Sequence, residues 1–533
     1  MTVKRPNVLL IMTDQQRADH LGCMGNSILR TPNIDRIARR GVRFEDCHVV
    51  NPICQVNRAS IMTGRYPSSH RVRCNGIPLS QDARTYADVL RDAGYRTVMI
   101  GKSHLQNITG LPPVIDPPGK GPYERRDGRL VEGEERHLDG PEYDAESTPL
   151  WQDDPDRGMP APYYGFDVAE VCTMHADQVS GAYERWLLDR CNDPDSLRGP
   201  VNALDKGTIT TPRAWRTRMP EELYPTTYVA ERTIAHIDRM TADGDDRPFL
   251  IKCSFPDPHA PFTPPGRYWS MYDPDAMPVS ESFGKGTSPV IEHMRKTLAD
   301  GTDKRNGELP FAVTEREARE SLALTYGMIA MIDDAVGRIL DRLEELGVMD
   351  NTIVVFMSDH GDEMGDHGIM QKGPLHYRGS TRVPFLWSDP AYPSRAGASV
   401  PGLASSIDFA QTLLQRLDLA EPYGMQGVSL LPLIDGTEAE VRDHIYMEDD
   451  RERIYLGFTE PQRLRTVLTH DHRLTVYDPL PWTEMFDLTQ DPGENTNLWD
   501  DPGQAALRSR MLELMVHAAI RSGERLPFLT GAA

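Results

Sequence analysis

The chain has 533 residues and a formal net charge of −22 at pH 7, from 80 acidic and 58 basic side chains. This excess of negative charge argues against nucleic acid or an anionic membrane as a partner. No apolar run reaches the roughly 18 residues that a membrane span needs. The length predicts one large and one smaller domain, and we expect a catalytic domain over 1–420 and a small C-terminal α+β domain over 421–533.

The cysteines and the N-terminal residues indicate the cellular compartment in which the protein is expected. Seven cysteines, an odd number without Cys-x-x-Cys spacing, fit a reducing compartment better than a disulfide framework. The first six residues lead directly into an apolar run, so we expect no signal peptide. Both observations predict a cytoplasmic protein.

Four short apolar runs, each followed by a polar cluster, predict the buried strands of a largely parallel sheet. They are residues 7–12, 97–100, 249–255 and 352–357. Ligands bind beyond the carboxyl ends of such strands. We therefore expect the polar residues that follow the runs to converge at one edge: Asp14, Lys102, His104, His259, Asp359 and His360.

The segments between these runs carry helix signals. Thr31 and Pro32 are typical of an N-cap and a first helical residue, for a helix over 33–40 that Gly41 closes. Further helices are predicted over 86–93, 226–240 and 314–346, the last with Gly347 as its C-cap. Strands that alternate with helices predict an α/β fold.

Beyond residue 420 the pattern changes. Residues 451–458 and 463–477 predict short strands with turns, and 504–520 predict a closing helix. We expect a small antiparallel sheet packed by that helix. Three irregular segments, 107–164, 192–225 and 274–310, are expected to be loops that select the substrate, with disordered surface as the alternative.

Cys54 stands where a Pro-containing loop meets a helical stretch over 57–63. Unpaired N–H groups and the helix dipole at such a place lower the pKa of a thiol and suit an anionic substrate. Arg58 adds a fixed positive charge. This segment alone fits equally well a nucleophile for a sulfate or phosphate group and a small buried hydrophobe. The four polar clusters favour the nucleophile.

With these motifs the chain resembles the sulfatase family of the alkaline-phosphatase-like superfamily, in the bacterial branch of arylsulfatases, choline sulfatases and phosphonate monoester hydrolases. The matching segments occur in family order: 13–16, 31–35, 54–66, 94–97, 101–104, 255–259, 358–362, 371–373 and 486–488. The resemblance implies a large, mostly parallel sheet between helices and a small C-terminal antiparallel-sheet domain.

The resemblance implies a metal-dependent sulfuric ester hydrolase that cleaves a sulfate monoester. In the family, a maturation enzyme oxidises the motif cysteine, here Cys54, to formylglycine. One hydroxyl of the hydrated aldehyde then attacks sulfur, with a divalent metal as Lewis acid. The implied metal ligands are Asp14, Asp359 and His360, with modified Cys54 as a further ligand and Gln15 as a weaker one. Ca²⁺ or Mn²⁺ is expected, and His360 makes Mn²⁺ a serious candidate.

The resemblance also implies roles around the anion. Arg58, Lys102 and Lys372 would stabilise charge on the nucleophile and on the non-bridging oxygens. His104 and His259 would be the acid and the base, in an order that the sequence leaves open, and Asn75 would contact the substrate. Asp362 and Asp366 are left out of the site. Four other histidines are expected to be structural: His175, His236, His367 and His376.

Val56 departs from the family's maturation signal, Cys-x-Pro-x-Arg, because it replaces the proline. Two alternatives to a sulfatase therefore stay open. One is a phosphonate monoester or phosphodiester hydrolase that uses the same site, and the other is a non-catalytic anion-binding homologue with unmodified Cys54. The expected partners are a small-molecule sulfate ester and the formylglycine-generating enzyme, and a homo-oligomer is compatible with the sequence.

Overall fold

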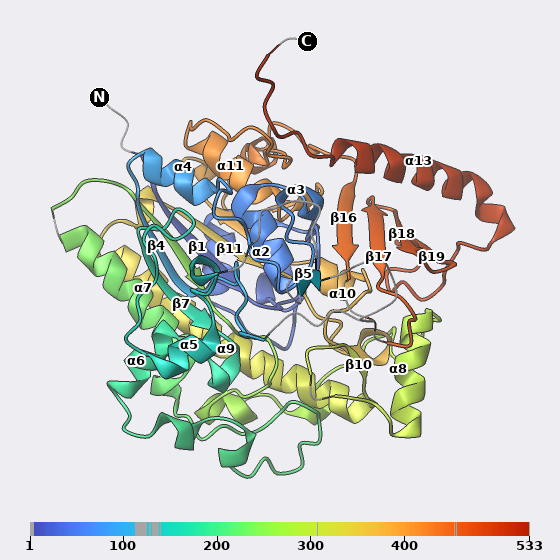
Figure 1. The fold of residues 1–533 in the computed structure, drawn as a ribbon, viewed down its shortest axis with the longest axis horizontal. Coiled ribbons are helices and arrows are strands. Elements are labelled where there is room, and N and C mark those ends of the chain that lie inside the picture. The colour runs from blue at the N-terminus through green and yellow to red at the C-terminus, as the bar shows by residue number, and fades with distance from the viewer. Residues whose placement is uncertain are drawn as a thin grey trace.

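A nine-stranded sheet in the order β14-β2-β13-β11-β1-β9-β4-β7-β8 forms the centre of the protein (Figure 1). The computed structural model describes residues 5–111, 125–126, 129–130, 138, 140–242, 244–305, 307–451, 454 and 456–531. Five consecutive strands are parallel: β11 (Thr352–Ser358), β1 (Asn7–Thr13), β9 (Phe249–Ser254), β4 (Arg96–Lys102) and β7 (Val168–Thr173). The predicted α/β fold with a mostly parallel sheet is confirmed.

The outer strands close the two edges. β13 (Phe385–Ser388) is antiparallel to β11 and to β2 (Val42–Phe44), and β14 (Ala398–Val400) is parallel to β2. On the other edge β8 (Ser180–Gly181) is antiparallel to β7. All four predicted runs are strands, and all lie in the parallel middle of the sheet.

The register of the middle strands places their polar ends together. β1 and β11 pair from Asn7 with Thr352 to Thr13 with Ser358, and Asp359 N continues the ladder by donating to Thr13 O at 3.2 Å. Asp14 and Asp359, the next residue on each strand, therefore emerge side by side.

Helices cover both faces of the sheet (Figure 1). One face packs against α2 (Cys54–Thr63), α4 (Tyr86–Asp92) and α11 (Asp408–Arg416). The other face packs against α1 (Ile34–Arg40), α7 (Pro225–Ala242) and α9 (Glu315–Glu345). Along β1, Leu10 and Met12 face the first layer, whereas Leu9 and Ile11 face the second. Two buried faces explain why this run is apolar without alternation.

The predicted start of the first helix is wrong by two residues. α1 begins at Ile34 after Asn33, not after Thr31, because Asp333 of α9 accepts hydrogen bonds from the amide N–H groups of Asn33 at 3.0 Å and Ile34 at 2.8 Å. A carboxylate from a distant helix thus supplies the cap.

α9 ends at Glu345 with Leu346 as its C-cap, and Gly347 follows in the left-handed region at φ 68°.

A separate four-stranded antiparallel sheet lies at the C-terminal end, with α13 (Ala505–Arg521) packed on it (Figure 1). Its strands are β16 (Ile445–Asp450), β17 (Arg463–Leu468), β18 (His472–Asp478) and β19 (Trp482–Asp487). The predicted strand over 451–458 is wrong, since β16 ends at Asp450; residues 452, 453 and 455 lie outside the described residues. β16 escaped prediction because its second half is acidic, and Asp450 is paired with Arg465 at 2.8 Å. None of the helices in the described part of the chain has the length and hydropathy that a bilayer crossing requires.

Lys252 is a buried lysine in the middle of β9. Its Nζ lies 3.8 Å from the Sδ of Met62, and burial, helped by Arg58, lowers its pKa to about 7. Between the ordinary lysine pKa and about 7, the unfolded chain binds a proton that the folded chain does not, so stability falls as the pH falls through this range. We expect Lys252→Met to raise the free energy of unfolding by about 2–4 kcal/mol at pH 7 and by less at pH 10.

Urea unfolding at the two pH values measures this effect. The matched control is Lys296→Met, because the Lys296 side chain is 73% exposed and should show no such pH-dependent gain. A Lys252→Met protein that is less stable than wild type at both pH values would show that the amine contributes a favourable interaction instead.

Candidate active site

The carboxyl ends of β1, β4, β9 and β11 bring the predicted polar residues together. Asp14 follows β1 and receives hydrogen bonds from Lys102 Nζ, at the end of β4, and from Arg58 Nη2 at 3.4 Å. Asp359 follows β11 and accepts from Arg58 Nε at 2.7 Å. These side chains are fully buried. The strand ends and α2 together therefore build one charged centre.

Cys54 is the first residue of α2 and points into this centre. Its Sγ lies 3.0 Å from His360 Nε2 and 3.8 Å from Asp14 Oδ1. Burial and Asp14 raise the pKa of the thiol, but Lys102, Lys372 and His360 outweigh them, and the pKa lies below its ordinary value. The surroundings thus favour the nucleophilic thiolate form.

Four buried residues form a group that could hold a metal ion: Asp14, Cys54, Asp359 and His360. Their ligating atoms all lie within 4.8 Å of one another. His360 Nδ1 donates to Gly361 O at 2.8 Å, which leaves Nε2 as the lone-pair nitrogen facing the group. Burial raises the pKa of Asp14, but Lys102 and Arg58 lower it to about 2; Arg58 likewise lowers the pKa of Asp359. Two ionised carboxylates and an imidazole suit a divalent cation.

All three guanidinium nitrogens of Arg58 donate hydrogen bonds within this centre. Besides the two carboxylates, its Nη1 donates to Lys102 O at 2.7 Å and to Ser254 Oγ at 3.0 Å. The side chain therefore positions Asp14 and Asp359. Its expected direct contact with the substrate oxygens stays a prediction.

Lys372 links two further predicted residues. Its Nζ donates to Gln15 Oε1 at 2.8 Å and to His259 Nε2 at 2.5 Å. Gln15 Nε2 donates in turn to Asp362 Oδ2 at 2.6 Å, so both ends of the Gln15 carboxamide are engaged by these two side chains. The ligand role of Gln15 stays a prediction. Asp362, which the sequence analysis did not assign to the site, orients the Gln15 carboxamide.

His104 and Asn75 lie in different settings. Burial and Lys102 hold the pKa of His104 well below its ordinary range, and its Nδ1 has no hydrogen-bond partner among the described residues. Its amide N–H donates to Glu146 at 2.7 Å; Glu146, in the irregular segment 107–164, is a site residue that sequence reasoning missed. Asn75 is exposed and accepts from Gln55 N at 3.3 Å, so its substrate contact stays a prediction.

His175 was expected to lie outside the site and lies within it. Its Nε2 is 2.6 Å from Lys102 Nζ, and its ring stacks on that of His259 with centroids 3.7 Å apart and an interplanar angle of 9°. Asp14, His175 and His259 form a second buried group of ligating atoms, but Lys102 Nζ contacts both Asp14 and His175 and supplies the positive charge there. The missed signal is positional, because His175 follows β7 as the predicted residues follow their strands.

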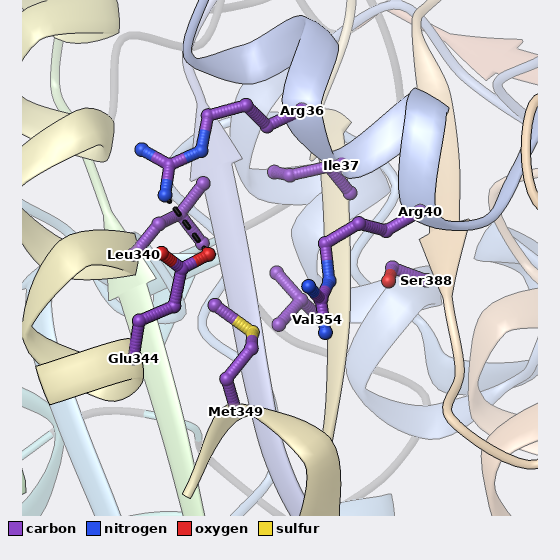
Figure 2. Close-up of a pocket in the computed structure, with 8 residues that line it drawn as sticks. All are labelled: Arg36, Ile37, Arg40, Leu340, Glu344, Met349, Val354 and Ser388. Atoms are coloured by element: carbon purple, nitrogen blue, oxygen red, sulfur yellow. Dashed lines mark ion pairs between the residues drawn. The ribbon is translucent and has the colours of Figure 1, made fainter. Parts of the chain in front are cut away.

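The hollow drawn in Figure 2 takes no part in this centre. It lies between α1 and α9, where Arg36 and Glu344 form an ion pair at 3.0 Å. Met349, which also lines it, precedes the amino end of β11, whereas Asp359 follows the carboxyl end. The hollow and the charged centre are therefore at opposite ends of the same strand.

Two family models match this chain. Residues 6–111 and 172–419 match the family model described as Sulfatase. The chain belongs to the sulfatase family. Residues 365–520 also match the model for the C-terminal region of N-sulphoglucosamine sulphohydrolase, which spans the small sheet and α13.

Relatives of this sulfatase-family chain align over nearly its whole length. It is 29% identical to an arylsulfatase of Clostridium perfringens over 93% of this chain and 90% of that one. It is 28% identical to the multifunctional alkaline phosphatase superfamily protein PehA of Trinickia caryophylli, over 94% and 93%. The crystal structure of the phosphonate monoester hydrolase of Agrobacterium radiobacter superposes with a TM-score of 0.75 at 27% identity, covering 98% and 97%. Membership of this family supports a hydrolase.

Proposed function

We propose that this protein hydrolyses a sulfate monoester to an alcohol and inorganic sulfate, with a nucleophile derived from Cys54. One observation supports this most strongly. Cys54 begins α2 inside a fully buried group of two carboxylates and an imidazole, with the ammonium groups of Lys102 and Lys372 lowering its pKa. Such a centre combines a nucleophile, a cation site and fixed positive charge for an anionic substrate.

Two additions complete the proposed chemistry. A divalent metal, Ca²⁺ or Mn²⁺, would be held by Asp14, Asp359, His360 and the residue derived from Cys54, and would supply Lewis-acid activation. Conversion of Cys54 to formylglycine would supply a hydrated aldehyde, with one hydroxyl for attack and a second for release of sulfate. Arg58 holds the two carboxylates in place for the metal.

The two predicted acid–base histidines differ in their settings. His259 Nδ1 donates to Ala260 O at 2.6 Å, so only its Nε2 can exchange a proton with substrate. Nε2 lies 3.5 Å from Glu308, whose side chain is largely exposed, and it accepts a hydrogen bond from Lys372 Nζ at 2.5 Å. We assign proton transfer to the leaving oxygen to His259 and the base role to His104, whose buried Nδ1 has no hydrogen-bond partner among the described residues.

A phosphonate monoester hydrolase is the second candidate, favoured by the likeness to the Agrobacterium radiobacter structure. Parallel measurements of kcat/KM on phenyl sulfate and phenyl phenylphosphonate, with Ca²⁺ or Mn²⁺, separate the two. We expect the sulfate to be the better substrate. A higher kcat/KM for the phosphonate ester would replace the first proposal by the second.

Peptide mass spectrometry across Cys54, on protein from its own host, tests the nucleophile. We expect a peptide in which the thiol sulfur is replaced by an aldehyde oxygen. A fully unmodified thiol in active protein would contradict the formylglycine route. An unmodified thiol in protein that binds anions without turnover would favour the non-catalytic homologue.

Val56→Pro should raise the converted fraction of Cys54 several-fold when the protein is co-expressed with a formylglycine-generating enzyme. The substitution restores the family's maturation signal. It should be tolerated because Val56 lies in the first turn of α2, where the first bond to a residue four back is that of Asn57 N to Ile53 O at 2.9 Å. The converted fraction is measured by mass spectrometry against Val56→Ala. Equal conversion in the two variants would show that the missing proline does not limit maturation.

A further inference from the structure

Segments 192–225 and 274–310 meet beside His259. The second was predicted to be irregular but contains the helix α8 (Pro289–Asp300). Arg213, from the first segment, donates from Nη2 to Glu308 Oε1 of the second at 2.5 Å and to Ala260 O at 3.2 Å. Ala260 O also accepts from His259 Nδ1, and Glu308 Oε2 lies 3.5 Å from His259 Nε2. These four residues form a closed ring of contacts that includes the imidazole assigned to the leaving oxygen.

Arg213 is held firmly in this ring. Its backbone is in the left-handed region at φ 56°, and its carbonyl accepts from Phe262 N at 2.8 Å. Two residues earlier, Thr211 N donates at 2.8 Å to Glu320 of α9. The side chain is only 8% exposed. Both the backbone and the guanidinium are therefore fixed before any ligand arrives.

One end of this guanidinium lacks an acceptor. Within the described residues, the buried Nη1 of Arg213 has no hydrogen-bond partner. Arginine stays protonated in proteins, and a buried donor left without an acceptor is costly and uncommon. Nη1 therefore marks a place where an acceptor from outside the described residues would be stabilising.

Glu308 differs from Arg213 in its freedom to move. Its side chain is 57% exposed, so it can turn into solvent without a burial cost. An ion pair with a partner this exposed contributes little to stability. The pair therefore joins a fixed cation to an anion that a ligand can displace.

We propose that Arg213 binds an anionic substituent, a carboxylate or a second sulfate, on the alcohol part of the substrate, and that Glu308 occupies that position until the substrate enters. The proposal rests on the proposed sulfatase function and narrows its substrate class to esters with a second negative charge. The planar guanidinium can offer Nη1 and Nη2 together to a two-oxygen anion.

A cationic substituent bound by Glu308 is the opposite reading, and the geometry disfavours it. Any group that reached Glu308 Oε1 would also approach the fixed charge of Arg213, and Lys372 Nζ lies 2.5 Å from the adjacent His259. Two cations beside one mobile carboxylate favour an anion.

Three phenyl sulfates test the proposal: one with a para carboxylate, one with the neutral para carboxamide and one with a para trimethylammonium group. The measurement is the ratio of kcat/KM for the carboxylate to that for the carboxamide. We expect wild type to favour the carboxylate by about tenfold to a hundredfold. Comparing the same ratio between variants cancels the intrinsic reactivity of the two esters.

Three variants test whether Arg213 and Glu308 determine this ratio. Arg213→Gln is expected to bring the kcat/KM ratio close to the ratio of the uncatalysed hydrolysis rates of the two esters. Arg213→Lys is expected to give an intermediate ratio, because lysine keeps the charge but lacks the planar pair of N–H donors. Glu308→Gln is expected to raise the ratio, since it removes the competing carboxylate. A ratio unchanged by Arg213→Gln would overturn the proposal. So would a preference for the trimethylammonium ester that Glu308→Gln abolishes.

A binding measurement keeps this test separate from the sulfatase assignment. Calorimetry compares 4-hydroxybenzoate with 4-hydroxybenzamide on wild type and on Arg213→Gln, and needs no turnover. Tighter binding of the benzoate that disappears in Arg213→Gln would support the anion site even if no sulfate ester were hydrolysed. Equal binding of the two phenols to wild type would overturn the anion site even if phenyl sulfate were hydrolysed.

Discussion

Replacing Cys54 with alanine is expected to lower kcat/KM for an aryl sulfate by at least about 10⁴-fold. The substitution removes the one atom that contacts both Asp14 and His360 from the start of α2, at 3.8 and 3.0 Å. The charged groups around it would remain, but no group would be left to form the covalent bond. Steady-state kinetics on phenyl sulfate with added metal measures the loss.

Two further variants test whether the loss is specific to Cys54 and whether one hydroxyl is enough for turnover. Cys253→Ala is the matched control, because Cys253 is a buried cysteine on the other face of the sheet and should leave kcat/KM within a fewfold of wild type. Cys54→Ser keeps one hydroxyl and lacks the second, so we expect it to take up one sulfate per active site and stop. Mass spectrometry would detect the sulfated peptide. Full turnover by Cys54→Ala would show that the nucleophile lies elsewhere.

Arg58→Met is expected to lower the free energy of unfolding by about 3–5 kcal/mol in the presence of a chelator. Arg58 is fully buried and pairs with Asp359 at 2.7 Å and Asp14 at 3.4 Å. Methionine fills much of the same volume but leaves two buried carboxylates facing each other. Arg58→Lys should lose less, because it retains the charge while it lacks the fork.

Added Mn²⁺ or Ca²⁺ is expected to recover part of the loss in Arg58→Met, since a cation bound to the folded state stabilises it by mass action. Urea unfolding with chelator and with metal measures both effects. Arg40→Met is the control, because Arg40 pairs with Asp350 at the surface and should cost less than about 1 kcal/mol. An equally small cost for Arg58→Met would mean that the two carboxylates are neutral in the folded protein.

The strand ends were predictable because their signal is local. An apolar run followed at once by Asp, Lys or His identifies both the buried strand and the side chains at its carboxyl end, as for β1 and Asp14. His175 escaped because β7 contains Glu170, which breaks the apolar pattern. That carboxylate is paired with Arg232 at 2.7 Å and His236 at 2.8 Å on α7, and such long-range pairing leaves no mark on the neighbouring sequence.

The same reason explains the other misses. The cap of α1 comes from Asp333, and Glu146 and Arg213 lie in irregular segments that have no periodicity to interpret. Cys54 and Arg58, by contrast, share one short helix, so the sequence placed them together, and the four polar clusters then favoured the nucleophile over a buried hydrophobe. Residues that act through tertiary contacts need the structure to be found.

If Cys54 is converted to formylglycine, the burial of its segment limits when the conversion can occur. Cys54 is 2% exposed, Val56 is fully inaccessible, and α2 lies between the sheet and its outer helices. An enzyme that reads this segment as an extended peptide can reach it only before the chain folds. Each molecule would therefore have its nucleophile decided during synthesis, by competition between folding and oxidation. A preparation would then be a mixture of two long-lived species, whose proportion records how fast the chain folded relative to the supply of the oxidising enzyme.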